Sequence, residues 1–506
     1  MKIMRKNIIL LGLVLTIFLS GCDSFLEEPA TKSGNLPKNV NELLAFYNSF
    51  LRRSDCNYRT FISDDATIPF TQEDAKNNVG TYQKRLFEFR SAFFLRDLRR
   101  VGTNGSYELW SSEYLSINSH NFVLSVIDNS DIEGSREEKE IVKAYAKFQR
   151  ALSYFDLVTS FSLPYAPGKN DNALGVVLRN TYSLEINEKN LKRSTLKETY
   201  DFIEKDLKES MGLIPDGNEK WKITKKAVYA FAARFYLMIG NYGEAKKYAE
   251  LALQRNSSLI DYTQLSTRSI QINNGSLKVI SYFYDMTTYD DFTIKNNPEL
   301  YYVDIQDITG KPCFPTQDLV GLFVNDANNN DVRFWNMPPE AGVRLSKYFN
   351  NSSPMMYRYY IGVSTGQMFT APDVPEMMLI MSECNAEAGD LAQAKQWLNK
   401  LREKRILHYN PTSVNALADK DKVLHFIYDE RRRERPFFLR SLDIRRLNAL
   451  KNENINIKKN FFEMTNTTLY PNRPMVYELK AGDNAYADFI PENDIALSEG
   501  NLQQNP

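Results

Sequence analysis

Two stretches of the chain carry the same pattern of apolar and polar positions. Residues 238–249 align without a gap on residues 387–398, and in both copies a glycine is followed at once by Asn or Asp. Small and aromatic residues then recur at i, i+3, i+4 and i+7, the spacing of one face of an α-helix. Glycine commonly ends a helix and Asn or Asp commonly begins one, so each copy predicts a helical hairpin.

Further helical periodicity flanks both copies. The stretches that keep it are 137–161, 196–211, 376–405 and 421–450. The arrangement resembles tetratricopeptide helix pairs, which stack because a single pair cannot bury its own apolar face. We expect helical-repeat segments at about 110–256 and 376–450. Trp110 and Tyr114, at the start of the first segment, are predicted to be core residues rather than ligand contacts.

The helical periodicity fails in the remaining segments, at about 55–107, 257–375 and 452–506. Asn, Asp, Gly, Pro and Tyr are frequent in the second of these, and its apolar runs, such as 279–284, are short. This composition predicts loops, turns and small strands. Structured loops on a rigid helical scaffold are where binding surfaces usually lie.

The N-terminus predicts a lipoprotein signal peptide. Basic residues precede an apolar run, Ile8–Leu19, that is too short to span a bilayer. Its Leu-Ser-Gly-Cys ending resembles the bacterial lipobox, in which the Cys is acylated and the chain is cut before it. We expect residues 1–21 to be removed, Cys22 to be lipidated, and residues 22–506 to form one binding body on the membrane. An ordinary secretory signal or a membrane helix at the start of the chain is the alternative.

Charge and cysteine content argue against several classes of protein. The 63 basic residues balance 63 acidic ones, which leaves no basic footprint for nucleic acid. Besides Cys22 the chain has Cys56, Cys313 and Cys384, an odd set without CxxC spacing, so neither a disulfide framework nor a zinc site is expected. No metal-binding motif is present, and we expect no metal and no cofactor.

Two motifs raise the alternative of a surface-tethered hydrolase. Residues 362–366 match GxSxG, with Ser364 as the nucleophile, but Pro372 and Pro375 follow too soon for the helix that this motif needs. The acidic pairs Asp64–Asp65 and Asp290–Asp291 could be glycosidase carboxylates. Adjacent residues do not specify the ~5 to 10 Å separation that glycoside hydrolysis requires. We therefore expect no enzyme.

Residues 430–435, Glu-Arg-Arg-Arg-Glu-Arg, look basic in isolation. Acids and arginines interleave at helical spacing from there to Arg446. This pattern favours internal ion pairing over phosphate binding.

The same segment carries a family resemblance. Glu430–Glu434, followed by Arg440, Asp443 and residues 445–446, is similar to the "ERRxE…GxRxxDLxR" helix of the SusD/RagB family of outer-membrane nutrient-uptake lipoproteins, although residues 438–439 are Phe-Leu where the family usually has Glu-Gly. Other stretches that resemble family landmarks follow in the expected order, and these are 143–165, 376–402, 489–491 and 501–506.

The resemblance implies a fold and a function. The fold is mainly α, a tetratricopeptide-like helical-repeat scaffold packed against an irregular loop-rich half with a few short strands. The function is non-covalent capture of an oligosaccharide, or in some members a peptide, at the cell surface. A SusC-like TonB-dependent barrel in the outer membrane is the expected partner. A purely structural adaptor that binds no small ligand is the third alternative.

The ligand-binding candidates lie in two loop regions, 56–107 and 282–335. Sugar rings present apolar C–H faces that stack on aromatic rings, while Asn, Asp and Arg bind the hydroxyls. Family binding sites fall in comparable regions, although no motif fixes the individual residues. The candidates are Tyr58, Asp64, Asp65, Tyr82, Arg96, Asn104, Tyr289, Asp290 and Trp335.

Overall fold

The computed structural model describes most of the chain from residue 37 onward. The described residues are 37–48, 52–53, 62–67, 105–183, 191–264, 267–274, 277–284, 297–307, 314–327, 330–333, 367–435, 437–464 and 469–506. Cys22 and Ser364 lie outside these ranges. In the described part of the chain, no helix is both long enough and apolar enough to cross a membrane.

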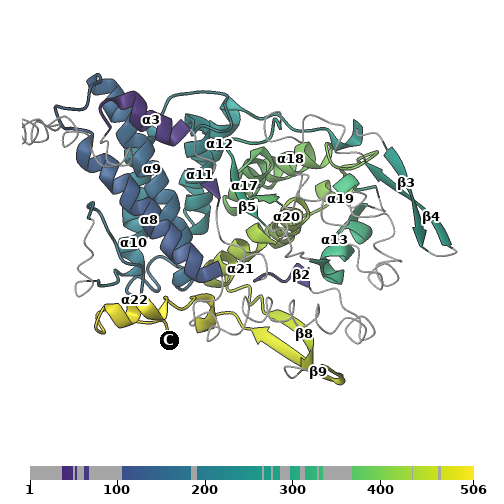
Figure 1. The fold of residues 1–506 in the computed structure, drawn as a ribbon. Coiled ribbons are helices and arrows are strands. Elements are labelled where there is room, and N and C mark those ends of the chain that lie inside the picture. Colours follow the sequence, from purple (N-terminus) through teal and green to yellow (C-terminus); the bar gives the residue numbers. More distant parts are fainter. Residues whose placement is uncertain are drawn as a thin grey trace, which may run out of the picture.

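The scaffold is a succession of packed helices (Figure 1). In chain order they are α8 (Gly105–Val126), α9 (Arg136–Phe161), α10 (Leu196–Met211), α11 (Lys225–Met238), α12 (Tyr242–Arg255), α17 (Val374–Glu387), α18 (Leu391–Arg402), α20 (Lys420–Glu434) and α21 (Phe438–Lys451). Helix α9 packs against α8 and α10, and α11 packs against α12. Helix α12 also contacts α17, which packs in turn on α18 and α20. The two halves of the helical scaffold, far apart in sequence, are thereby joined.

The two predicted hairpins have matching geometry. Gly240 after α11 and Gly389 after α17 take φ values of 75° and 87°, a left-handed backbone that glycine adopts without steric cost. Asn241 and Asp390 then cap α12 and α18, because their side chains accept hydrogen bonds of 3.2 and 3.0 Å from the backbone three residues later. The repeat predicted from sequence is confirmed.

The core between α9 and α11 is aromatic. Phe231 of α11 lies edge-on to Phe148 and Phe155 of α9, with ring centroids 5.8 and 5.3 Å apart. Edge-to-face contacts of this kind add to the free energy that burial of the rings supplies. Ala227 and Ala230 on α11 are fully buried, and their small side chains let neighbouring helices approach closely.

The remaining elements of the molecule are short helices, turns and hairpins. The helices are α3 (Val40–Asn48), which packs on α9, α13 (Gln317–Ala327), α19 (Thr412–Asn415), which packs on α18, and α22 (Glu492–Leu497), and short 3₁₀ turns occur at Tyr262–Gln264 and Asn484–Tyr486. The strands are β1 (Arg52–Arg53), β2 (Ala66–Thr67), β3 (Thr267–Asn274), β4 (Leu277–Tyr284), β5 (Asp304–Asp307), β6 (Phe314–Pro315), β7 (Gln367–Phe369), β8 (Ile457–Met464) and β9 (Leu469–Leu479).

These strands form small separate sheets. Strand β5 lies between β1, its parallel neighbour, and antiparallel β7. The pairs β2–β6, β3–β4 and β8–β9 are antiparallel, and the last two project from the body as ribbons (Figure 1). The predicted fold class, a helical-repeat scaffold with a loop-rich half, is confirmed.

Helix α13 lies in a segment that the sequence predicts as loop. Leu319 and Phe323, one turn apart, are fully buried, and the helix packs against α20. One apolar turn in an Asn-rich and Pro-rich segment does not by itself indicate a helix. Here tertiary burial decides the conformation.

Candidate functional site

Helix α20 carries a buried network of arginines and carboxylates. Glu430 is fully buried, and its carboxylate oxygens lie 2.5 Å from Arg402, 2.8 Å from Arg333 and 2.9 Å from Arg433. Burial acts to raise the pKa of Glu430, but the three guanidinium groups outweigh it and hold that pKa far below its usual range. The predicted internal ion pairing of 430–435 is confirmed.

The same network continues into α21. Asp443 accepts hydrogen bonds of 2.8 Å from both Arg431 and Arg446, and Arg446 also binds Glu383 of α17 through both carboxylate oxygens. Burial would raise the pKa of Asp443, but Arg431 and Arg446 lower it to about 2. The charges of the "ERRxE" segment therefore hold helices together and face no open surface.

Asp64 and Asp65, two of the predicted ligand contacts, join this network at its edge. Asp64 receives two hydrogen bonds of 2.7 Å from Arg440, and Asp65 receives one of 2.9 Å from Nε of Arg432. The Asp65 side chain is fully buried, whereas that of Asp64 is 24% exposed. Lys459 Nζ donates to the backbone carbonyl of Ser63 beside them.

The two acids differ in ionisation. Burial acts to raise the pKa of Asp64, but Arg440 outweighs it and lowers that pKa below its ordinary value. Burial dominates at Asp65 and raises its pKa to about 6 against the opposing charge of Arg432. Neither acid resembles one of a pair of carboxylates placed across a scissile bond.

This segment also brings the two predicted loop regions together. Strand β2 pairs with β6, Ala66 opposite Pro315, and Thr316 binds the backbone carbonyls of both Asp64 and Asp65. Asp64 and Asp65 thus anchor the meeting point of the two regions on α20 and α21. The other candidates lie outside the described residues, and their contact with a ligand stays a prediction, as does that of Asp64 and Asp65. They are Tyr58, Tyr82, Arg96, Asn104, Tyr289, Asp290 and Trp335.

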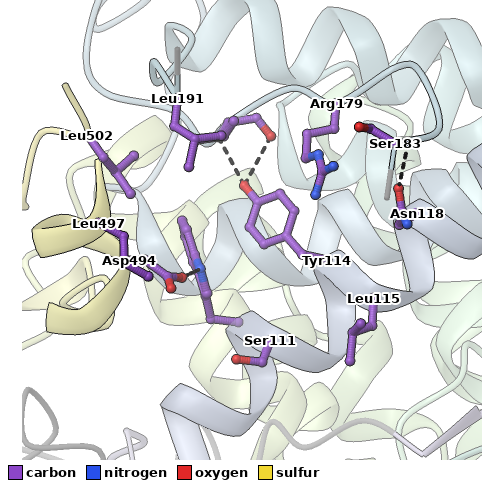
Figure 2. Close-up of a pocket in the computed structure, with 12 residues that line it drawn as sticks. Ser111, Tyr114, Leu115, Asn118, Arg179, Ser183, Leu191, Asp494, Leu497 and Leu502 are labelled. Carbon is purple, nitrogen blue, oxygen red and sulfur yellow. Dashed lines mark hydrogen bonds between the residues drawn. The ribbon is translucent and has the colours of Figure 1, made fainter. Parts of the chain in front are cut away.

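A pocket of about 330 Å³ lies between α8, the segment 177–183 and α22. Figure 2 shows the pocket, which we name the α8–α22 pocket. Its volume is at the small end of the range typical of small-molecule sites, ~300–1,000 Å³. The residues that line it are Trp110, Ser111, Tyr114, Leu115, Asn118, Val177, Arg179, Ser183, Leu191, Asp494, Leu497 and Leu502.

The back wall of the pocket is rigid. Tyr114 Oη donates a hydrogen bond of 3.0 Å to the carbonyl of Val177 and accepts one of 3.0 Å from its N–H. Trp110 packs edge-on to Tyr114 and donates from Nε1 to Asp494 at 2.6 Å. Burial raises the pKa of Tyr114 well above its usual range, so the phenol stays neutral. The wall links α8 to the 177–183 segment and to α22.

The mouth of the pocket combines apolar and polar side chains (Figure 2). Leu115 and Leu497 are 70% and 53% exposed. Asn118 accepts a long hydrogen bond of 3.4 Å from the N–H of Ser183. The Arg179 guanidinium points into the same space, and it has no ion pair or hydrogen bond within the described residues, although its backbone is bound by Tyr154. A mixed surface of this kind suits a ligand that has both an apolar face and hydroxyl groups.

The C-terminal tail holds α22 in place. Asn505 is buried, accepts a hydrogen bond of 2.8 Å from Arg193 and donates one of 2.9 Å to the carbonyl of Phe161 at the end of α9. Arg193 also donates to the carbonyl of Gly175, and burial among these neutral acceptors lowers its pKa to about 10, so it stays charged at neutral pH. We call residues 501–506 the C-terminal strap. Leu502 of this strap lines one side of the pocket.

Comparison with protein families explains why these elements occur together. A model described as "Starch-binding associating with outer membrane" matches residues 69–237, and the SusD family model matches residues 233–506, more than half of the chain. The chain belongs to the SusD family. The resemblance inferred from the arginine-rich helix is therefore confirmed across the helices and the C-terminal tail.

Solved structures of the SusD superfamily share the fold at low sequence identity. One from Bacteroides thetaiotaomicron is 18% identical and covers 92% of this chain and 100% of its own, with a TM-score of 0.58. One from Bacteroides vulgatus is 17% identical and covers 92% and 97%, with a TM-score of 0.60. A laminarin-binding SusD-like protein is 17% identical and covers 93% and 99%, with a TM-score of 0.53. A search of curated proteins found no significant match.

The sequence did not predict the α8–α22 pocket as a possible ligand site. Trp110 is buried at 4% exposure, as predicted for a core residue, yet one side of it faces the pocket. No local motif marks Arg179, and only the fold brings it into one pocket with residues of α22. In the described residues, no group of three or more His, Cys, Asp or Glu side chains could hold a metal ion.

Proposed function

We propose that this SusD-family chain captures an oligosaccharide at the cell surface and delivers it to a SusC-like TonB-dependent barrel in the outer membrane. The observation that carries the proposal is the pair of family matches, which together extend from residue 69 to residue 506. The laminarin-binding relative supports a glycan ligand and makes β-glucans a first choice for testing.

Binding without chemistry is the second part of the proposal. Of the acids considered for a hydrolase, Asp64 and Asp65 each bind an arginine and brace the fold. An alternative remains in Ser364 or in Asp290 with Asp291. Incubation of the purified protein with laminarin, starch and pectin separates the two functions, since a binder retains the polymer and releases no reducing ends.

The ligand test is calorimetry with oligosaccharides and with peptides. We expect at least one series of oligosaccharides to bind and the peptides to give no heat of binding. Binding of peptides alone would move the chain to the peptide-capturing type of the family, and binding of neither would favour a structural adaptor.

The membrane arrangement is tested separately. Cys22→Ala should give a folded protein that no longer fractionates with membranes, since the lipid is the proposed anchor. Mild detergent extraction of the native protein should recover a large TonB-dependent barrel with it. Membrane retention of Cys22→Ala, or recovery of the native protein only as a free monomer in several detergents, would contradict this arrangement.

A further inference from the structure

The α8–α22 pocket is separate from the loop regions in which ligand contacts are predicted. Its walls come from α8, the 177–183 segment and α22, whereas Asp64 and Asp65 lie beside β2, α20 and α21. In Figure 1, α22 lies below α10, to the left of α21, whereas β2 lies to the right of α21. A ligand in the pocket would therefore occupy a second site.

Three features of the pocket point to a ligand. Its back wall is fixed in advance by the hydrogen bonds of Tyr114 and Trp110, so little conformational entropy is lost when a ligand binds. Leu115 and Leu497 stay largely exposed at its mouth although they are strongly apolar. Exposed apolar side chains at the rim of a concave, largely apolar site are typical of a binding surface.

Arg179 is the third feature. The arginines of α20 and α21 described above bind carboxylates, but the Arg179 guanidinium has no such partner within the described residues. Its planar set of N–H donors suits vicinal hydroxyls or a carboxylate. Asn118 beside it offers both a donor and an acceptor.

We propose that the α8–α22 pocket binds a pyranose unit of a glycan. The C–H face of the ring lies against Tyr114 and Leu115, its hydroxyl or carboxylate edge is bound by Arg179 and Asn118, and Leu497 lines the far end of the same pocket (Figure 2). The size of the pocket, about 330 Å³, limits the occupant to one or two sugar units. The site would give the protein a second hold on a chain that is captured elsewhere, or a preference for particular chain ends.

The test uses short probes that one pocket can hold. Laminaribiose, maltose and digalacturonate are titrated calorimetrically into the full mature protein, and crystals are soaked with the same probes. We expect at least one disaccharide to bind, with its density in the pocket. Neutral and carboxylated probes distinguish whether Arg179 binds hydroxyls or a carboxylate.

Variants then assign the binding to this pocket. Arg179→Ala should lower the affinity for the bound probe about tenfold or more, the effect expected when a charged hydrogen bond is lost. Arg179→Lys should lower that affinity less. The double variant Leu115→Ala with Leu497→Ala should weaken it by about threefold to tenfold. Matched controls are Arg136→Ala, an exposed arginine on α9, and Leu213→Ala, a leucine 41% exposed beyond α10, and neither should change affinity.

The outcomes separate this site from the proposed function. Absence of binding by all three probes, or unchanged affinity in both pocket variants, would overturn the pocket assignment. Capture of long oligosaccharides by those same variants would show that the general function stands even then. Failure of every long glycan to bind the unmodified protein would count against the proposed function itself.

Discussion

Two regions of the molecule use arginine in opposite ways. In the network around α20 and α21, guanidinium groups are buried and matched to carboxylates, as at Glu430 with its three arginines. In the α8–α22 pocket, Arg179 is partly exposed and has no such partner within the described residues. A buried charge needs an opposite charge nearby to offset the free energy lost on its desolvation. A partly exposed charge remains hydrated and is available to bind a ligand.

The two regions differ in whether their arginines are available to bind a ligand. The arginine-rich segment is the part of the sequence that most strongly indicates the family, yet its side chains are taken up in holding helices together. The pocket has no motif, but its charged group is accessible. Removal of side chains from the first region should therefore cost stability, and removal from the second should cost binding.

The largest effect is expected at Glu430. Glu430→Ala leaves three buried arginines without their shared carboxylate, and we expect a loss of about 3–5 kcal/mol in the free energy of unfolding. Urea denaturation measures it. Asp201→Ala is the control, because its pair with Lys197 is exposed and should contribute under about 0.5 kcal/mol. Equal effects in the two variants would mean that the buried network stabilises the fold no more than an exposed ion pair does.

Asp65 should make stability depend on pH. Its pKa of about 6 in the folded protein lies above the unfolded value of about 3.9, so the folded state binds more protons between these values. Stability should therefore rise as pH falls from about 6 to 4, by up to about 1.4 kcal/mol per pH unit relative to Asp65→Asn.

Denaturation curves of wild type and Asp65→Asn, measured in parallel from pH 4 to 7, test whether stability rises as pH falls. Arg432, Arg440, Lys459 and Asp64 all act on this carboxyl, so the comparison is made between variants rather than from one curve. At Asp64, whose pKa is lowered, stability is instead lost as pH falls below about 4. A constant difference between wild type and Asp65→Asn from pH 4 to 7 would refute the assignment.

The C-terminal strap should show an intermediate effect. Asn505→Ala removes the acceptor for Arg193 and the donor to Phe161, and we expect a loss of about 1–3 kcal/mol. Hydrogen exchange should become faster in residues 488–506, which include α22. Gln503→Ala, at an exposed position two residues earlier, should leave exchange unchanged. Identical exchange in both variants would mean that Asn505 does not hold α22.

The smallest effect on stability is expected at Arg179. Because the Arg179 side chain makes no ion pair or hydrogen bond within the described residues, Arg179→Ala should change the free energy of unfolding by less than about 0.5 kcal/mol. Thermal and urea denaturation measure this change. A large loss would make Arg179 a structural residue, like the arginines of α20, and would weaken the case for the pocket.

Much of the scaffold follows from local pattern. Apolar periodicity locates the helices, and the Gly-Asn and Gly-Asp steps place both hairpin turns at residues that take the required backbone conformation. Charge interleaving correctly indicates ion pairing at 430–435. The sequence pattern does not predict helix α13, because its short apolar pattern is stabilised by packing against the distant helix α20. It does not predict the long hairpin β8–β9 either, because the pattern of residues 457–479 is irregular.

The sequence by itself determined the helical repeats, because their pattern depends on residues a few positions apart, and its ordered motifs indicated the family. Interleaved charges indicated that the arginines of α20 and α21 pair internally, but spacing reaches only pairs such as Glu430 with Arg433, and the fold supplies distant partners such as Arg333 and Arg402. Only the tertiary structure decided which side chains share a site. It joined Asp64 to Arg440 and Trp110 to Asp494, pairs separated by hundreds of residues, and it placed Arg179 in one pocket with residues of α22, without a partner among the described residues. No local spacing encodes these encounters, since the packing of helices and the C-terminal strap brings the residues together.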